Sequence, residues 1–408
     1  MQYYKNIEIS KRYHVSLTAV AKWIEAAKRG RIELQLHRIG VRAYIASTAK
    51  NQLVMDELAR QGKKFINSRS RKTVRPSQHF YELYSRQEIF DIIANIEKHR
   101  EIPLQYVYFD GGAEYWDKYM QKLLSDETPN TLTSTLKLLE LAHGAITNLI
   151  GEHRRINVID LGVGNAMPVR GLLSHLLAEG RLHRYLALDD SQAMLDIAER
   201  NVKAWFDGQV NFEGYVRDIL TDRFDDLIAA DSFDGSDSLN LVLLLGGTLS
   251  NLPDPEHTLQ LIHRSMDRRD LLVFTRKLDT PQARTFFDFN PDDSVAPLPP
   301  SQKMIPDLLN IDESFYDVEQ LFDPTDQARY IRIRLKVTLS IVFEMGGRER
   351  TVTLDKGEAL LLWRARHQNT LDVIRQFDRN NFELLNTSKM RNNEYILLVY
   401  EVREDAGR

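Results

Sequence analysis

From residue 156 onward, apolar strand-like runs and amphipathic helix-like segments alternate along the chain. An apolar run over residues 156–161 precedes a helical pattern over 169–178, and a second run over 185–188 precedes a helical pattern over 192–206. This alternation is typical of a parallel sheet whose strands are joined by crossover helices. Further strands are expected over residues 214–219, 239–245, 270–274, 382–385 and 395–400.

Small and acidic residues stand where the first two of these strands end. Gly162-Val163-Gly164 closes the first strand, and Asp189 closes the second. The glycines let the backbone pass close to a ligand, and a carboxylate can accept hydrogen bonds from two vicinal ribose hydroxyls. A dinucleotide site prefers a third glycine, whereas Met167 occupies that position here. The pattern therefore indicates a nucleoside-containing cofactor and disfavours NAD.

The run Asp160-Leu161-Gly162-Val163-Gly164 resembles motif I of class I S-adenosylmethionine methyltransferases. The resemblance implies S-adenosylmethionine as the cofactor, and residues 382–385 and 395–400 as the closing antiparallel strand pair of that fold. In the family, motif I surrounds the methionine half of the cofactor, and acids after the next two strands bind the ribose and the adenine amino group. Carried over to this chain, the cofactor-binding residues are Asp160, Gly162, Gly164, Asp189, Asp190, Asp218, Ile219 and Gly246. No catalytic residue is assigned and no metal is expected.

The segment over residues 243–252 resembles the corresponding segment of the histidine-specific Nα-methyltransferases of ergothioneine biosynthesis. That resemblance spans roughly residues 150–400 and implies an inserted substrate lobe, with Asn251 at the family's substrate-contacting asparagine. The family's Glu-x-Ser, which grips histidine, falls on Leu362 and Arg364, so histidine itself is not the expected substrate. The family's upstream aromatic stretch is replaced by residues 106–109 and 113–116. The substrate-binding candidates are Asn251, Tyr115, Trp363 and Arg364.

The charge of the chain is divided unevenly between its N-terminal segment and the remainder. Residues 1–76 hold 17 Lys+Arg and 5 Asp+Glu, a net charge of +12, whereas the rest of the chain has a net charge of −16. A compact basic segment attached to an acidic body is typical of a polyanion-binding module. The chain has no cysteine, which excludes disulfides and thiolate chemistry and fits a reducing compartment.

Within the basic segment, helices are expected over residues 6–13 and 17–26, with Ser16 as the N-cap of the second. Alternating residues over 32–38 and 41–45, joined through a turn at Ile39-Gly40, predict a β-hairpin. This segment resembles the winged helix-turn-helix of excisionases and mercury-resistance-type regulators. The resemblance implies DNA binding, with a protein-docking domain as the alternative. The DNA-binding candidates are Thr18, Lys22, Arg38 and Arg42.

The expected fold is α/β, a Rossmann-like class I methyltransferase core with an inserted α+β substrate lobe and a small N-terminal winged helix-turn-helix. We expect the N-terminal module over residues 1–59 and a basic linker over 60–80. The helical part of the substrate lobe is expected over residues 81–150, the cofactor-binding core over 151–280 with 366–403, and the insertion over 281–365.

Three functions remain open from the sequence. The first is N-methylation of an amino acid or small amine, with the N-terminal module binding DNA. The second is a transcription regulator whose inactive methyltransferase-like lobe senses S-adenosylmethionine or a metabolite, and the third is methylation of a nearby protein or nucleic acid. DNA methylation itself is disfavoured, because no cysteine is present and Ser250-Asn251-Leu252-Pro253 is not the motif that stacks a flipped base.

The expected partners are a small-molecule methyl acceptor and, through the N-terminal module, DNA. A homodimer is also considered. No apolar run is long enough to cross a membrane, and no secretory signal pattern opens the sequence, so no membrane contact and a cytoplasmic location are expected.

Overall fold

The structure is a computed structural model that divides into two compact units. Unit 1 comprises residues 1–73 with 337–340, and unit 2 comprises residues 74–336 with 341–408. The residues described are 3–13, 15–39, 42–69, 71–108, 112–125, 130–153, 155–229, 238–280, 298 and 300–403. Three expectations fall outside this part of the chain: the hairpin turn at Gly40, the aromatic Phe109, and residues 281–297 of the insertion.

A seven-stranded sheet forms the centre of unit 2 and confirms the Rossmann-like core. The strand order is β15-β16-β9-β8-β5-β6-β7, with β5 to β9 parallel to one another and β16 antiparallel to both β9 and β15. The expected closing antiparallel pair is therefore confirmed. The strands are β5 (Arg155–Leu161), β6 (Leu182–Asp189), β7 (Phe212–Val216), β8 (Ser238–Leu244), β9 (Leu271–Lys277), β15 (Phe382–Lys389) and β16 (Tyr395–Val402).

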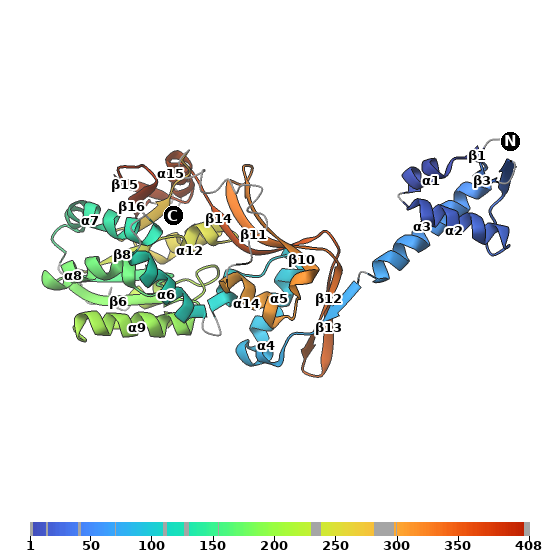
Figure 1. Ribbon diagram of the computed structural model, residues 1–408. Helices are drawn as coiled ribbons and strands as arrows, with labels where there is room; N and C mark the ends of the chain where they lie inside the picture. Colours follow the sequence, from blue (N-terminus) through green and yellow to red (C-terminus); the bar gives the residue numbers. More distant parts are fainter. Residues whose placement is uncertain are drawn as a thin grey trace. The chain divides into compact units, whose positions relative to one another are not determined.

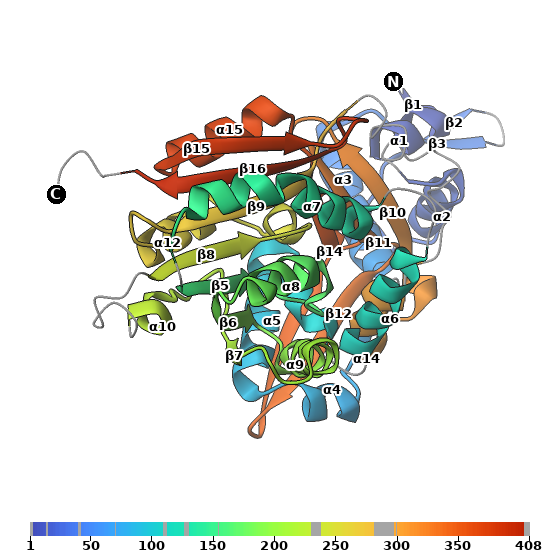
Figure 2. The same cartoon turned by 90° about the vertical axis from the view of Figure 1, so that its left-hand side faces the viewer.

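Helices cover both faces of this sheet, because the central strands are apolar on both sides. On one face, apolar side chains of α7 (Thr131–Ile150), α8 (Arg170–Ala178) and α9 (Gln192–Phe206) pack against the strands, and Figure 2 shows these helices in front of the sheet. On the other face lie α10 (Asp225–Ala229), α12 (Pro255–Ser265) and α15 (Thr370–Arg379).

Polar side chains cap the first turn of several of these helices. Ser191 accepts a hydrogen bond from the backbone N–H of Met194 at the start of α9. Asn130 starts α7 with a reciprocal capping box that includes Thr133. Asn369 starts α15 by accepting from the N–H of Asp372. Each cap satisfies a backbone donor that the helix itself leaves unpaired.

A second, strand-rich lobe of unit 2 is built from two distant chain segments. Backbone hydrogen bonds join them, from Ser77 N to Leu308 O at 2.8 Å and from Ile102 N to Leu361 O at 2.9 Å. One antiparallel sheet of this lobe has the strand order β10-β11-β14 (Figure 1). The strands β12 and β13 are hydrogen-bonded to each other. The later segment provides α14 (Pro300–Leu308), η5 (Glu313–Phe315), β10 (Tyr316–Asp323), β11 (Ala328–Leu335), β12 (Thr338–Met345), β13 (Arg348–Leu354) and β14 (Ala359–Arg366). The first three residues of β12 belong to unit 1. The earlier segment provides α4 (Gln78–Leu83), α5 (Arg86–His99) and η1 (Leu104–Tyr108), and α6 (Gly112–Leu124) follows it.

Unit 1 contains the two helices and the hairpin expected at the N-terminus. Its elements are β1 (Tyr3–Tyr4), α1 (Asn6–Tyr13), α2 (Leu17–Lys28), β2 (Leu36–Ile39), β3 (Arg42–Ala46), α3 (Ala49–Arg69) and β4 (Arg71–Val74), the last reaching one residue beyond the unit. Val20 and Ile24 of α2 are buried against Ile9, Ile45 and Met55. Asn51 of α3 is also buried, and its amide pairs with both backbone groups of Gln35, so it fixes the helix to the start of the hairpin.

Two expected boundaries differ from the structure. Helix α7, expected in the substrate lobe, packs on the core sheet, because its leucines, isoleucines and alanines form an apolar stripe at helical spacing. Residue 60, expected to begin a linker, lies within α3, which continues to Arg69. None of the described helices is both long and apolar enough to cross a membrane.

Candidate functional site

The loop after β5 adopts a backbone conformation that strongly favours glycine. Gly162 and Gly164 have φ angles of +71° and +55°, in the left-handed region. A Cβ atom at Gly162 would lie 3.0 Å from Cγ2 and 3.1 Å from Oγ1 of Thr248, so the loop after β8 closes tightly on this glycine. The two loops lie at the carboxyl ends of neighbouring parallel strands, which is where ligands bind in open α/β sheets.

Asp189 holds the glycine loop in place. One carboxylate oxygen accepts a hydrogen bond from Gly164 N at 3.3 Å, and the other accepts from Ser191 N at 3.1 Å. Burial raises the pKa of Asp189, and the backbone donors act in the opposite direction. Its neighbour Asp190 is exposed over the residue as a whole. Burial of the Asp190 carboxyl group and the neighbouring charge of Asp189 nevertheless raise the pKa of Asp190, so the two predicted carboxylates lie close together and Asp189 organises the loop.

Asp160 is buried at the end of β5, where Tyr185 donates a hydrogen bond to its carboxylate at 2.9 Å. Burial raises the pKa of Asp160 to about 7, against the lowering effect of that hydrogen bond. A positive charge placed nearby would favour the ionised form of this carboxylate.

Asp218 and Ile219 follow β7 and are both half-buried. The carboxylate of Asp218 accepts a hydrogen bond from Leu220 N at 2.8 Å, and burial raises its pKa. Ile219 packs against the apolar cluster on the α12 side of the sheet. Both residues therefore lie beyond the carboxyl end of a strand that neighbours β6.

Helix α6 lies against the glycine loop, which the sequence did not predict. Asn165 in the loop donates a hydrogen bond to Asp117 of α6 at 2.8 Å, and both residues are buried. The indole nitrogen of Trp116 would lie 3.6 Å from a Cβ atom at Gly164. The predicted substrate residue Tyr115 is 42% exposed, so Trp116 rather than Tyr115 faces this loop. The sequence offered one signal for this contact, which is an acidic residue, Asp117, within an amphipathic helix.

On the other side of the glycine loop, Gly246 and Asn251 lie in the segment after β8. Gly246 has a φ of +71°, and its N–H donates to Oγ1 of Thr275 at 2.8 Å. Asn251 is the half-buried last residue of the short helix α11 (Thr248–Asn251). Since α11 begins with the residue that touches Gly162, Asn251 is one helical turn away from the glycine loop.

Trp363 and Arg364 are neighbours on β14 and lie on opposite faces of it, so they do not line one pocket together. Arg364 forms an ion pair with Glu101, and both side chains are largely buried. Trp363 lies beneath the guanidinium of Arg329, at 5.8 Å from the ring centroid. Leu362, at the family's glutamate position, is buried beside them.

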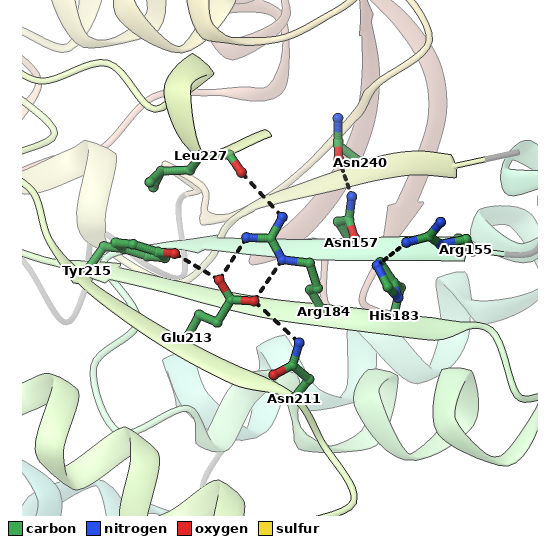
Figure 3. A network of polar contacts seen from close by, with 9 residues as sticks. All are labelled: Arg155, Asn157, His183, Arg184, Asn211, Glu213, Tyr215, Leu227 and Asn240. Carbon is green, nitrogen blue, oxygen red and sulfur yellow. Dashed lines mark hydrogen bonds and ion pairs between the residues drawn. The ribbon is translucent and has the colours of Figure 1, made fainter. Parts of the chain in front are cut away.

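A polar network at the amino ends of the strands is separate from this site (Figure 3). Arg184 of β6 binds Glu213 of β7 through two contacts of 2.7 Å, and Tyr215 donates to the same carboxylate. Asn157 donates to Asn240 across β5 and β8 at 2.9 Å. Because the glycine loop and Asp189 lie at the opposite ends of these strands, this network joins strands and is not part of the candidate site.

The predicted DNA-binding residues lie in unit 1. Thr18 and Lys22 are exposed on α2, and Arg38 is exposed near the tip of the β2–β3 hairpin. The side chain of Arg42 lies outside the described part of the structure. A shallow surface hollow runs along α2 and is lined by Thr18, Ala21, Lys22, Glu25, Ala26, Arg29 and Arg31. Glu25 pairs with Lys28 at 2.7 Å, so its charge is already compensated.

Comparison with known families identifies the chemistry. The profile of a family described as histidine-specific, S-adenosylmethionine-dependent methyltransferases matches residues 86–285. This range contains the glycine loop, Asp189, Asp218 and Asn251. The chain is an S-adenosylmethionine-dependent methyltransferase. Its cofactor is therefore S-adenosylmethionine, as the sequence predicted.

Solved methyltransferase structures resemble this methyltransferase only distantly. One from Clostridium acetobutylicum is 14% identical, covering 71% of this chain and 99% of its own, with a TM-score of 0.40. The 1,6-didemethyltoxoflavin-N1-methyltransferase of Burkholderia thailandensis is 10% identical, covering 81% and 94%, with a TM-score of 0.38. The CcbJ methyltransferase of Streptomyces caelestis is 13% identical, covering 72% and 96%, with a TM-score of 0.34. None of the curated proteins compared matches the chain.

Proposed function

We propose that this methyltransferase transfers the methyl group of S-adenosylmethionine to an amine nitrogen of an amino acid or another small molecule. The observation that carries the proposal is the contact between Thr248 and Gly162, which brings the α11 segment, and with it Asn251, beside the glycine loop. An amide at that place can accept a hydrogen bond from an amine and donate one to a neighbouring oxygen of the same substrate.

The cofactor would lie across the carboxyl ends of β5, β6, β7 and β8. Gly162, Gly164 and Gly246 would leave room for its methionine half, and Asp160 would face the positive charge there. The ribose hydroxyls would meet Asp189 and Asp190, and the adenine would meet Asp218 and Ile219. The raised pKa values of Asp160, Asp189 and Asp218 and the close approach of the two loops support this arrangement.

The transfer itself is an in-line displacement at a sulfonium, so the protein mainly has to orient the nucleophile and exclude water. A neutral amine would attack the methyl carbon as the carbon–sulfur bond breaks, the sulfur would keep the bonding pair and leave as a neutral thioether, and the methylated amine would then lose its proton to solvent or to a nearby acceptor. Helix α6, through Trp116 and Asp117, is the element that would cover the reacting atoms.

Free histidine does not suit the substrate lobe. In place of a carboxylate that could accept a hydrogen bond from an imidazole, the lobe offers the buried Leu362 and the Arg364–Glu101 ion pair. A buried polar group left without its partner costs about 1–3 kcal/mol. We therefore expect another amine, with Trp363 and Tyr115 further from the reacting centre than Asn251.

A methyl-transfer screen over amino acids, their derivatives and simple amines, with product masses measured, tests the proposal. The wild type should methylate at least one amine and should leave histidine unmodified. Asn251→Ala should reduce turnover at least tenfold and change S-adenosylmethionine affinity by only a few-fold. Asn211→Ala, at the amino edge of the sheet, is the control and should retain activity. Cofactor binding with no turnover of any amine would favour the sensing function instead.

We further propose that unit 1 binds duplex DNA through α2 and the β2–β3 hairpin. The exposed face of α2 carries Thr18 and Lys22, with Arg29 and Arg31 at its end, and Arg38 is exposed on the hairpin. A helix presented in this way fits the major groove, and a basic hairpin can follow the adjacent phosphates. A homodimer would place two such modules on two half-sites.

Fluorescence anisotropy of labelled duplex DNA with the full chain tests this second proposal. Affinity should fall steeply as salt rises, because bound lysines and arginines displace counterions. Lys22→Ala should weaken binding, whereas Lys203→Ala, on the exposed face of α9, should not. If Lys203→Ala alone reduces the affinity, DNA is bound by the methyltransferase body and the proposal fails.

A further inference from the structure

The strand β9 ends in an arginine that is buried in the protein. Arg276 is 2% exposed and is paired with Ile396 of β16. Its side chain therefore lies on the face of the sheet that α12 and α15 cover. One guanidinium N–H donates to the backbone carbonyl of Arg366 at 2.8 Å. Its Nε has no hydrogen-bond acceptor among the described residues. Burial lowers the pKa of Arg276 to about 9, so the group is still charged at neutral pH.

Arg366 adds positive charge beside Arg276 and lowers the pKa of Arg276 further. The acids Asp254 and Asp326 act in turn on Arg366. Burial, together with Arg329, Arg276 and Lys277, lowers the pKa of His367 to about 3, so this histidine is neutral. Asp279 is the acid that acts on this histidine in the opposite direction. A buried charge is costly unless a charge of opposite sign and hydrogen bonds compensate it.

Arg366 connects this cationic cluster to the substrate side of the site. Its guanidinium donates to the backbone carbonyls of Leu252 and, at 3.0 Å, of Pro253, which directly follow Asn251. The cluster therefore adjoins the segment that we assign to the amine of the acceptor. Guanidinium groups bind carboxylates and phosphates through paired N–H donors, which makes them suited to anions with two or more oxygens.

We propose that the cluster around Arg276 and Arg366 binds the anionic group, a carboxylate or a phosphate, of the methyl acceptor. The inference rests on the proposed amine methylation, since it assigns the second functional group of the same substrate. The acceptor would then carry its amine near Asn251 and its acid group between the ends of β9 and β14.

Anion titration of the full chain tests the inference without requiring turnover. Inorganic phosphate and succinate, each at constant ionic strength balanced with sodium chloride, should raise the thermal midpoint of the wild type in a saturable way. Arg276→Gln should weaken the affinity for these probes at least tenfold. Arg379→Gln, an exposed arginine of α15 paired with Glu256, is the control and should bind as the wild type does. No saturable effect in the wild type, or equal affinity in Arg276→Gln, would overturn the inference.

A second variant keeps the test decisive if Arg276→Gln does not fold. His367→Glu places a carboxylate among the same cations, so it should compete with the probes and weaken their binding at least tenfold. Unchanged probe binding in His367→Glu would also overturn the inference. Anion binding without transfer to any amine would leave the inference standing and remove only the proposed function. Equal turnover of an amine substrate with a free carboxylate and of its methyl ester would overturn the inference and leave the proposed function standing.

Discussion

The close approach of Thr248 to Gly162 gives a quantitative prediction for Gly162→Ala. Two costs add at this position. An alanine in the left-handed region costs roughly 1–2 kcal/mol relative to glycine. Its Cβ atom would also lie 3.0 Å and 3.1 Å from side-chain atoms of Thr248, and relieving such overpacking typically costs about 1–3 kcal/mol. We therefore expect the free energy of unfolding to fall by roughly 2–5 kcal/mol.

Gly180→Ala separates the two costs. Gly180 has nearly the same φ, +66°, but a Cβ atom there would meet nothing within 4 Å. Its substitution should cost only the conformational part, about 1–2 kcal/mol. The contact part should be recovered in Gly162→Ala combined with Thr248→Ala, which leaves the nearest Thr248 atom, Cβ, at 3.7 Å. Chemical denaturation of the wild type, Gly162→Ala, Thr248→Ala and the double variant measures the coupling in a double-mutant cycle.

The same proteins tell whether this contact shapes the cofactor site. Calorimetric titration with S-adenosylmethionine should show weakened binding in Gly162→Ala, partial recovery in the double variant, and wild-type affinity in Gly180→Ala. Equal destabilisation by Gly162→Ala and Gly180→Ala, with no coupling to Thr248, would refute the reasoning from loop contact.

Two further predictions concern the buried carboxylates. Because burial raises the pKa of Asp160 to about 7, the folded chain keeps a proton that the unfolded chain has lost above pH of about 4, so the free energy of unfolding should fall as pH rises between these values. Asp160→Asn should remove this pH dependence, which amounts to at most about 1.4 kcal/mol per pH unit. Chemical denaturation of both proteins at pH 5 and pH 8 measures it, and the same difference in free energy of unfolding between them at the two pH values would contradict the prediction. Asp189→Ala should weaken S-adenosylmethionine binding by about 1–3 kcal/mol, because both the glycine loop and the ribose lose a carboxylate, and unchanged calorimetric affinity would argue against that role.

The core of the fold could be predicted because its signals are local. The strand over residues 155–161, the glycines after it and the acid that ends β6 all follow from composition within a few positions. The helix over residues 192–206 was predicted with the bounds that the structure has, since Ser191 caps it and its apolar residues recur at helical spacing.

What the sequence did not reveal depends on pairs of residues far apart in the chain. The Arg364–Glu101 ion pair joins residues 263 positions apart, so the local pattern gave no sign that Arg364 is neutralised. The fifth strand was expected to end at residue 274, but β9 continues to Lys277, and Arg276 within this extension is buried because β16 pairs alongside it. Trp363 and Arg364 were both predicted as substrate-binding residues, and strand geometry places them on opposite faces of β14.

The position of β16 in the core sheet has a consequence for how the protein is made. This strand lies between β9 and β15, and its partner β9 was synthesised more than a hundred residues earlier, with Arg276 opposite Ile396. While the ribosome adds the whole insertion, β9 remains an unpaired apolar edge of the kind that recruits other chains. Folding of the methyltransferase core therefore waits for residues 395–402, and a nascent chain stalled within the insertion presents a sheet that a chaperone, or another nascent copy, can reach.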